Sequence, residues 1–330
     1  MNKLQKSWFR VYVLLITAIT FYQCNPEPSK EETTDVKEDS VSINKEWVAP
    51  DANSIAATEE GNLIRYGKNL IASTANYLGP KGTVAHITNG MNCQNCHLDR
   101  GTKIYGNNYG SVLSTYPTLK PRSGKIESAI DRVNDCLKRS LNGQPLDANS
   151  KEMRSIIAYF NFLGASVPKG KKAPGSGLKD LPLLARAADP EKGKMVFTLR
   201  CQSCHLENGQ GQKNAGESEY IYPPLWADNS YNVGAGLFRI SNFAKYVKYN
   251  MPKGTNFDAP LLSDEEAWDV AAFVNSKPRP HYDISKDWPD ISKKPFDHPF
   301  GPYADGFSAN QHKYGPFQPI IDAQKKQAKK

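Results

Sequence analysis

The sequence predicts an all-α protein with two tandem domains, followed by a long irregular extension at the C-terminus. Two observations define the domains: the pattern CxxCH occurs at residues 93–97 (CQNCH) and again at 201–205 (CQSCH), and similar helical patterns surround both copies. A third defines the extension, because residues 278–330 are rich in proline and aromatic residues and show no clear periodicity. A chain of 330 residues is long enough for two domains of ordinary size.

The first residues have the pattern of an export signal. Three basic residues within the first ten precede an apolar stretch at 11–22, which is too short to span a membrane comfortably. The stretch ends at Cys24 and a polar run follows, as in a lipoprotein signal. The residues before Cys24 are bulkier than is usual there, so an ordinary cleaved signal peptide is the alternative. We expect a signal peptide (1–23), a flexible tether (24–57), a lipid anchor at Cys24, and a place in the periplasm or cell envelope.

The charge of the chain limits its partners. The formal net charge is +8, which suits nucleic acid, an anionic membrane or a small anionic substrate. The sequence has no dense Lys/Arg stripe with interleaved aromatic residues, so nucleic acid is the weakest of the three. We therefore expect no nucleic-acid partner.

The two CxxCH motifs predict two covalently bound haem c groups. The two thiols of a motif add to the vinyl groups of haem, and the adjacent histidine becomes the fifth ligand of the iron. A zinc site would need further paired ligands at close spacing, and a redox CxxC pair needs no histidine after it. The attachment residues are Cys93, Cys96 and His97 in the first copy, and Cys201, Cys204 and His205 in the second.

The segments around each motif repeat as well. A helical pattern with a glycine, Gly67 or Gly193, precedes each motif, and an amphipathic helix with a serine N-cap and an acidic first turn follows at 150–163 and 263–276. This is the order of elements in a cytochrome c-type domain, present twice. The predicted boundaries are 58–167 for the first domain, 168–187 for a linker, 188–277 for the second domain and 278–330 for the extension.

The second axial ligand of such a domain comes from the loop before its last helix. In the second copy this loop contains YNMPKG, in which Met251 is followed by Pro252. A His/Met haem is a good electron carrier with a raised potential. Methionine also fills gaps in hydrophobic cores, which is the alternative role. We expect Met251 to ligate the second haem.

In the first copy the corresponding loop, RVNDCLKRSLNGQP, holds Cys136 but no methionine or histidine. Three roles are open to Cys136: a buried free thiol, a disulfide partner of Cys24, or an iron ligand. We favour the ligand, because Cys24 belongs to a tether and Met153 lies within the last helix and is expected in the core. A thiolate lowers the potential of a haem, and its sulfur is a nucleophile suited to sulfur chemistry.

The residues near Cys136 suit an anion. If RVNDCLKRS is helical, Arg132, Cys136 and Ser140 share one face through their i, i+4 spacing, and Arg122 lies upstream in YPTLKPRSG. Guanidinium groups bind oxyanions through paired hydrogen bonds and stay charged at neutral pH. For each arginine alone, a contact with a haem propionate or a solvated surface position is the alternative.

These residues resemble a known family, the dihaem c-type thiosulfate dehydrogenases and tetrathionate reductases. The similarity extends from about residue 61 to 321 and rests on the segments MNCQNCHLDRGT, YPTLKPRSGKI, RVNDCLKRSLNG, CQSCHLENGQG, YPPLWADNSYNVGAGLFR, YNMP and HKYGPFQPI. It implies that two thiosulfates are converted to tetrathionate plus two electrons, or the reverse, at a first haem ligated by His97 and Cys136. It implies that Arg122, Arg132 and Ser140 line the substrate pocket. The second haem, ligated by His205 and Met251, would relay electrons to a c-type cytochrome or similar carrier.

Two other functions stay open. A dihaem electron-transfer protein without its own substrate would use Cys136 only to tune a potential, and would not turn over sulfur anions. A different thiolate-haem enzyme of sulfur oxidation would act on protein-bound sulfur and need a partner subunit. The direction of the thiosulfate reaction is also open, because some family members carry a lysine where this chain has Asn250.

Overall fold

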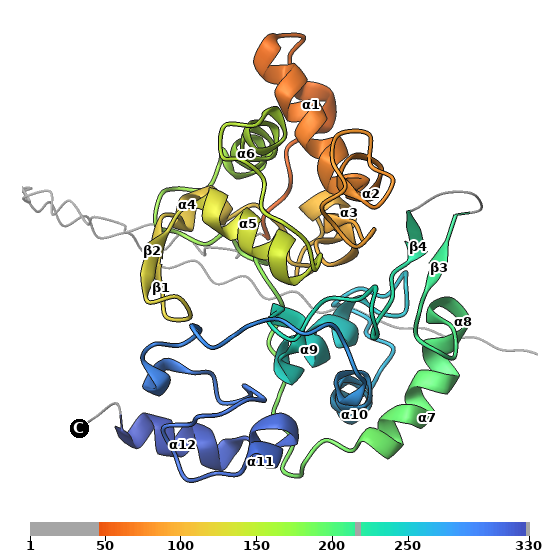
Figure 1. Ribbon diagram of the computed structural model, residues 1–330, viewed down its shortest axis with the longest axis vertical. Coiled ribbons are helices and arrows are strands. Elements are labelled where there is room, and N and C mark those ends of the chain that lie inside the picture. The colour runs from red at the N-terminus through yellow and green to blue at the C-terminus, as the bar shows by residue number, and fades with distance from the viewer. Residues whose placement is uncertain (1–45, 215–218, 328–330) are drawn as a thin grey trace, which may run out of the picture. The chain divides into compact units, whose positions relative to one another are not determined.

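The computed structural model describes residues 46–214 and 219–327. The predicted signal peptide, Cys24 and most of the predicted tether lie outside these residues. In the described part of the chain, helices dominate, and the strands form only two small antiparallel pairs, β1–β2 and β3–β4 (Figure 1). The predicted all-α class with two cytochrome c-type domains is confirmed. None of the helices within 46–214 and 219–327 has the length and apolar character to cross a bilayer.

The first domain encloses its CxxCH motif between an early helix and a late one. Its principal helices are α1 (Glu59–Ala72), α5 (Ala129–Arg139) and α6 (Lys151–Gly164). The shorter elements are η1 (Ala52–Ser54), α2 (Thr74–Leu78), η2 (Cys93–Asn95), α3 (Leu98–Gly101), α4 (Val112–Thr115), β1 (Thr118–Lys120) and β2 (Lys125–Glu127).

The second domain repeats this plan. Helix α7 (Pro190–Arg200) leads into the motif, α9 (Ile240–Asn250) precedes Met251, and α10 (Asp264–Ser276) ends the domain. The shorter elements are α8 (Gln202–His205), β3 (Gln212–Lys213), β4 (Tyr220–Tyr222) and η3 (Gly236–Phe238).

The first and last helices of each domain cross at a glycine. A Cβ atom at Gly67 of α1 would overlap the carbonyl oxygen of Ser155 in α6, and one at Gly193 of α7 would overlap that of Asp269 in α10. The equivalence of these crossings supports the repeat seen in the sequence. The close approach lets two backbones touch, which any larger residue would prevent.

The predicted N-caps of the last helices are confirmed. The Ser150 hydroxyl accepts a hydrogen bond from the backbone N–H of Met153, and Ser263 accepts one from Glu266. The Glu266 carboxylate in turn accepts from the Ser263 N–H, so α10 begins with a reciprocal capping box. These bonds satisfy N–H groups that have no partner within the helix.

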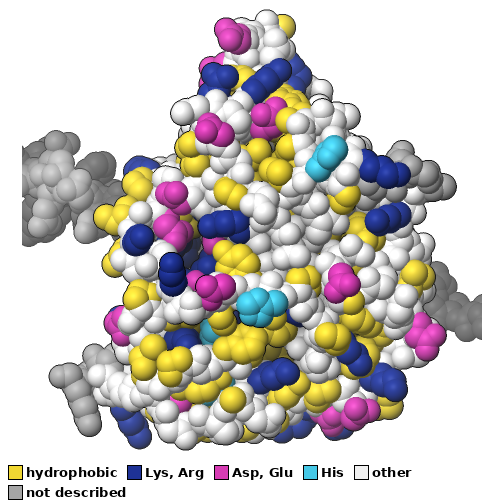
Figure 2. Space-filling view, in the orientation of Figure 1, with side chains coloured by type: hydrophobic (Ala, Val, Ile, Leu, Met, Phe, Trp, Pro, Cys, Tyr) yellow, Lys and Arg dark blue, Asp and Glu magenta, His cyan; other side chains and the backbone are white. Residues whose placement is uncertain are grey.

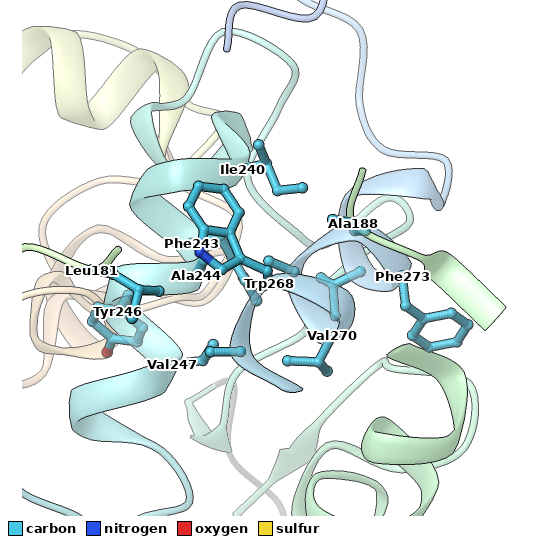
Figure 3. Close-up of a cluster of buried hydrophobic side chains, with 14 of the residues drawn as sticks. Leu181, Ala188, Ile240, Phe243, Ala244, Tyr246, Val247, Trp268, Val270 and Phe273 are labelled. Carbon is cyan, nitrogen blue, oxygen red and sulfur yellow. The ribbon is translucent and has the colours of Figure 1, made fainter. Parts of the chain in front are cut away.

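Each domain has its own hydrophobic core. In the first, Met153 is fully buried together with side chains of α1 and α6, which confirms its predicted core position. In the second, Phe243 and Val247 of α9 pack with Trp268 and Val270 of α10 (Figure 3). Burying a side chain of this size stabilises the fold by roughly 1.5–3 kcal/mol.

The C-terminal extension is less irregular than the sequence suggested. Beyond η4 (Ile291–Lys293) it forms α11 (Ala309–Tyr314) and α12 (Gln318–Gln327). Both helices are short, and Phe317 and Ile320 stabilise this region by packing into the second-domain core beside Trp268. Tertiary packing of single residues leaves little periodicity in a sequence, which explains why these helices were not predicted.

The end of the predicted tether is also structured. Within residues 46–57, Trp47 is buried in the first-domain core, and its backbone N–H donates to the carbonyl of Pro174. Its ring lies against Gly110. Residues of the predicted tether next to Trp47 are therefore fixed against the first domain by an aromatic side chain.

We predict that Gly67→Ala destabilises the first domain, because its methyl group would overlap the Ser155 carbonyl. Overpacking of this kind costs roughly 1–3 kcal/mol. Circular dichroism should record a lower temperature of thermal unfolding for this variant. Gly306→Ala is the control, since a Cβ there meets no atom within 4 Å. Equal unfolding temperatures for the two variants would show that the helix crossing tolerates a side chain.

Candidate functional site

A cavity in the first domain contains most of the predicted site residues. Its empty space is about 980 Å³, part of it open to solvent, and its lining is mainly apolar side chains such as Leu70, Ile156 and Phe160. The predicted residues that line it are Cys93, Cys96, His97, Arg132, Cys136 and Ser140.

The ring of His97 is held in one orientation. Its Nδ1 lies 2.6 Å from the carbonyl oxygen of Asn107, and the ring stacks on Tyr109 at 4.4 Å between centroids. A carbonyl can only accept, so Nδ1 carries the proton and Nε2 has a free lone pair. Burial lowers the pKa of His97 to about 4, which keeps the ring neutral, as an iron ligand must be.

The cysteines of the first motif are half-buried and line the cavity. Burial raises the pKa of Cys93 to about 11 and that of Cys96 to about 12. The Thr74 hydroxyl donates to the Cys93 sulfur at 3.2 Å. A redox-active CxxC pair needs a lowered thiol pKa, so this environment argues against that alternative and agrees with covalent attachment of a cofactor.

Helix α5 presents its predicted face to the cavity. A capping box between Ser128 and Asp131 begins the helix, and Arg132, Cys136 and Ser140 all line the cavity from successive turns. The nearness of the Cys136 sulfur is the largest cause of a raised pKa for the Arg132 guanidinium. Cys136 is in no disulfide among the described residues, and Cys24, the other partner considered, lies outside them.

Arg122 lies beside the cavity rather than on its wall. It belongs to the turn between β1 and β2, and its guanidinium donates to the Asp135 carboxylate. Arg132 reaches the same carboxylate oxygen at 3.3 Å. Burial alone would raise the pKa of Asp135, but the surrounding guanidinium groups hold it below its usual value. The two predicted arginines are therefore joined by one ionised carboxylate. On the face of the molecule drawn in Figure 2, Lys and Arg side chains lie among Asp and Glu side chains.

The sequence analysis missed two residues of this site. Tyr116 lines the cavity, and Asp135 joins the arginines. Asp135 had a detectable signal, since it stands at i+3 from Arg132 on the predicted helix. Tyr116 had no such signal in the sequence, apart from its position in the same segment as Arg122.

The second motif has the same histidine geometry as the first. The Nδ1 of His205 lies 2.8 Å from the carbonyl oxygen of Pro223, which again leaves Nε2 free. Burial raises the pKa of Cys201 to about 12 and lowers that of His205. Met251 is the residue directly after α9, is half-buried, and packs against the same core as Cys201.

The loop of the first motif contacts the segment around Met251. The side-chain amide of Asn250 donates to the Tyr105 carbonyl at 3.1 Å, and the ammonium of Lys103 donates to the Thr255 carbonyl at 2.9 Å. The Tyr246 hydroxyl donates to the carbonyl of Asn95, between the two cysteines of the first motif. The two predicted haem sites are thus connected by direct hydrogen bonds.

The residues at both motifs fit haem c. Each supplies two thiols outside any disulfide and a neutral imidazole with Nε2 unblocked, and the first adds a cavity with a mainly apolar lining. Two cytochrome c domains, each with an attachment site, define a dihaem cytochrome c in which both haem groups are covalently bound.

Comparisons with known proteins identify the family. The family "SoxA/TsdA, cytochrome c domain" matches residues 84–168, and the family "Cytochrome c" matches residues 190–277. The chain is 35% identical to the thiosulfate dehydrogenase of Stutzerimonas stutzeri, over 70% of this chain and 72% of that protein. It is 36% identical to the thiosulfate dehydrogenase of Allochromatium vinosum, over 67% of this chain and 79% of that protein. The chain belongs to the thiosulfate dehydrogenase family.

A solved structure agrees with this assignment. The as-isolated form of a thiosulfate dehydrogenase (TsdBA) from Marichromatium purpuratum matches with a TM-score of 0.66 and 27% sequence identity. The match covers 71% of this chain and 50% of the other, so this chain spans about half the length of that protein.

Proposed function

We propose that this protein oxidises thiosulfate and joins two molecules into tetrathionate at the first haem, while the second haem passes the electrons to a c-type cytochrome or similar carrier. The observation that carries the proposal is the pairing of Cys136 with Arg132 on one wall of the first cavity. A nucleophilic sulfur beside a fixed cation suits a small sulfur anion. The reverse reaction, tetrathionate reduction, uses the same groups.

The proposed axial ligands are His97 and Cys136 for the first haem, and His205 and Met251 for the second. The support is the shared cavity of His97 and Cys136, and the place of Met251 between α9 and α10. The core-filling alternative for Met251 is less favoured, because the side chain is only half-buried, whereas Met153 of the other domain is fully buried.

The chemistry balances with the groups present. When bound, each of the two haems can accept one electron. The Cys136 thiolate forms an S–S bond with the sulfane sulfur of one thiosulfate, and the pair gives up two electrons. The sulfane sulfur of the second thiosulfate then attacks the bound sulfane sulfur. This releases tetrathionate and restores the Cys136 thiolate, so no proton or further reactant is needed.

The arginines offset the repulsion between the substrates. The thiosulfate bonded to Cys136 keeps one negative charge and the second thiosulfate carries two, so at about 6 Å they repel each other by about 5.5 kcal/mol at an effective dielectric constant of about 20. A guanidinium at a similar distance from the second thiosulfate recovers about the same energy. Arg132 on the cavity wall and Arg122 beside it are the proposed source of this attraction. Ser140 adds a hydroxyl that can donate to a sulfonate oxygen.

Two alternatives remain to be distinguished by assay. A pure electron-transfer protein would use the thiolate only to lower a potential and would show no turnover with thiosulfate or tetrathionate. Another thiolate-haem sulfur enzyme would require a partner carrying bound sulfur. Assays with thiosulfate and an artificial acceptor, and with tetrathionate and a reduced donor, separate all three functions.

We predict that Cys136→Met abolishes turnover in both directions while both haems stay attached. The thioether still ligates iron but cannot bond covalently to a sulfane sulfur, and losing a nucleophile costs about a thousand-fold in rate or more. Mass spectrometry verifies the haem content. Lys138→Met, on the same helix but not on the cavity wall, is the control. A wild-type rate for Cys136→Met would leave the thiolate only a tuning role.

We predict that Met251→Ala lowers the reduction potential of the second haem alone, because a thioether ligand raises the potential. The expected change is on the order of 0.1 V or more, within the range of about 0.8 V that axial ligands cover. Spectroelectrochemical titration measures both potentials. Met195→Ala changes an exposed methionine of α7 and should alter neither. If Met251→Ala and Met195→Ala gave the same two reduction potentials, Met251 would be a core residue and not an iron ligand.

We propose further that the protein is exported and anchored by lipid at Cys24, on the support of the N-terminal sequence pattern alone. Cys24→Ser should move the protein from the membrane fraction to the soluble fraction, because acyl chains provide the attachment. Ser29→Ala is the matched control. A wild-type protein that fractionates as soluble, with an N-terminus of unmodified mass, would instead fit an ordinary signal peptide.

A further inference from the structure

The C-terminal extension reaches the arginines of the first domain. The two carboxylate oxygens of Asp287 each accept a hydrogen bond from the Arg139 guanidinium, both at 2.7 Å, although the residues are 148 positions apart in the chain. Both side chains are only about 10% exposed. Paired bonds of this geometry fix a guanidinium in direction as well as in place.

Arg139 passes this constraint to the substrate pocket. Its Nε donates at 2.6 Å to one oxygen of Asp135, whose other oxygen accepts from Arg122 and Arg132. The ion pairs therefore form a continuous chain from Asp287 through Arg139 and Asp135 to Arg132 on the cavity wall and Arg122 beside it. The cluster has one more positive charge than negative, since it combines three guanidiniums with two carboxylates.

The backbone of the extension holds the same turn. The N–H of Trp288 donates to the Arg122 carbonyl at 2.7 Å. Gly124, in the same β1–β2 turn, faces Pro289 so closely that a Cβ would lie 2.8 Å from its ring. The residue that follows Asp287 thus fixes the main chain of Arg122, while Asp287 acts on its side chain through Arg139 and Asp135.

We propose that Asp287 is a positioning residue for substrate binding, and that the C-terminal extension completes the anion site of the first domain. The proposal rests on the proposed function of that site. Without the Asp287 charge, Arg139 keeps its 3.3 Å bond to the Gly234 carbonyl and its position over the Tyr282 ring, but it can turn toward Asp135 and compete with Arg122 and Arg132 for that carboxylate. Arg132 on the cavity wall and Arg122 beside it then lose their fixed directions, and the net charge of the cluster rises from +1 to +2.

The test compares the kinetics of thiosulfate oxidation by the full-length holoenzyme and its variants. Asp287→Asn should raise KM for thiosulfate about tenfold and change kcat less than about twofold, because orientation of the bound anion is what is lost. Its activity should also fall more steeply with added salt, since unpositioned charges are screened more effectively. Asp283→Asn, an exposed acid of the same extension, is the matched control and should match the wild type.

A charge-restoring variant makes the test specific. The double variant Arg139→Gln with Asp287→Asn removes one charge of each sign. The Asp135 carboxylate then keeps its hydrogen bonds from Arg122 and Arg132 and loses its competing arginine. The KM of this double variant should return to within about threefold of the wild type, because the members of one network are not additive. A general loss of packing would instead make the double variant worse than either single one.

Three results would overturn the proposal. They are a KM for Asp287→Asn within twofold of the wild type, a fall in kcat and unfolding temperature at unchanged KM, and a double variant worse than both single ones. If Asp287→Asn does not fold, Asp287→Glu keeps the charge, displaces it by one methylene, and should raise KM about threefold. A wild-type protein without thiosulfate turnover would refute the proposed function instead. Hydrogen exchange of residues 118–127 would still report whether Asp287 fixes the β1–β2 turn.

Discussion

The close contact between the first and last helices is the constraint on which each domain depends. At Gly67 and Gly193 the two backbones meet without a side chain between them. This contact brings the CxxCH motif, which follows the first helix, against the core built on the last helix. The hydrogen bonds between each motif histidine and a backbone carbonyl follow from that enclosure. A small set of interhelical contacts therefore positions the chemistry of both domains.

The two domains show how one scaffold serves two purposes. The segment before the last helix is α9 and Met251 in the second domain, and α5 with Cys136 in the first. The helices around these segments are equivalent, so the difference in proposed chemistry comes from one ligand position and its neighbours. Arg132 and Ser140 accompany the thiol, whereas buried apolar residues of α9 accompany the methionine. The fold supplies the haem sites, and under the proposed function these local differences would separate a reactive site from a relay.

The sequence predicted correctly those features that depend on residues close to one another along the chain. The CxxCH motifs, the serine caps at 150 and 263, and the shared face of Arg132, Cys136 and Ser140 all follow from spacings of a few residues. Asp287 could not be found in this way, because its partner Arg139 is 148 residues distant and lies in another domain. Helices α11 and α12 were missed for a related reason. Their stability comes from the packing of Phe317 and Ile320 into the second-domain core rather than from a helical periodicity of apolar residues in their own sequence.

The path of the extension has a consequence for how the protein matures. A chain leaves the ribosome from its N-terminus, and early domains generally fold first. The residues of the first domain are therefore made before those of the extension. Its arginine cluster, however, lacks part of its contacts until Asp287 and Trp288 are in place. A chain that ended before Asp287 would thus contain both CxxCH motifs but lack the contacts that fix Arg139 and the β1–β2 turn.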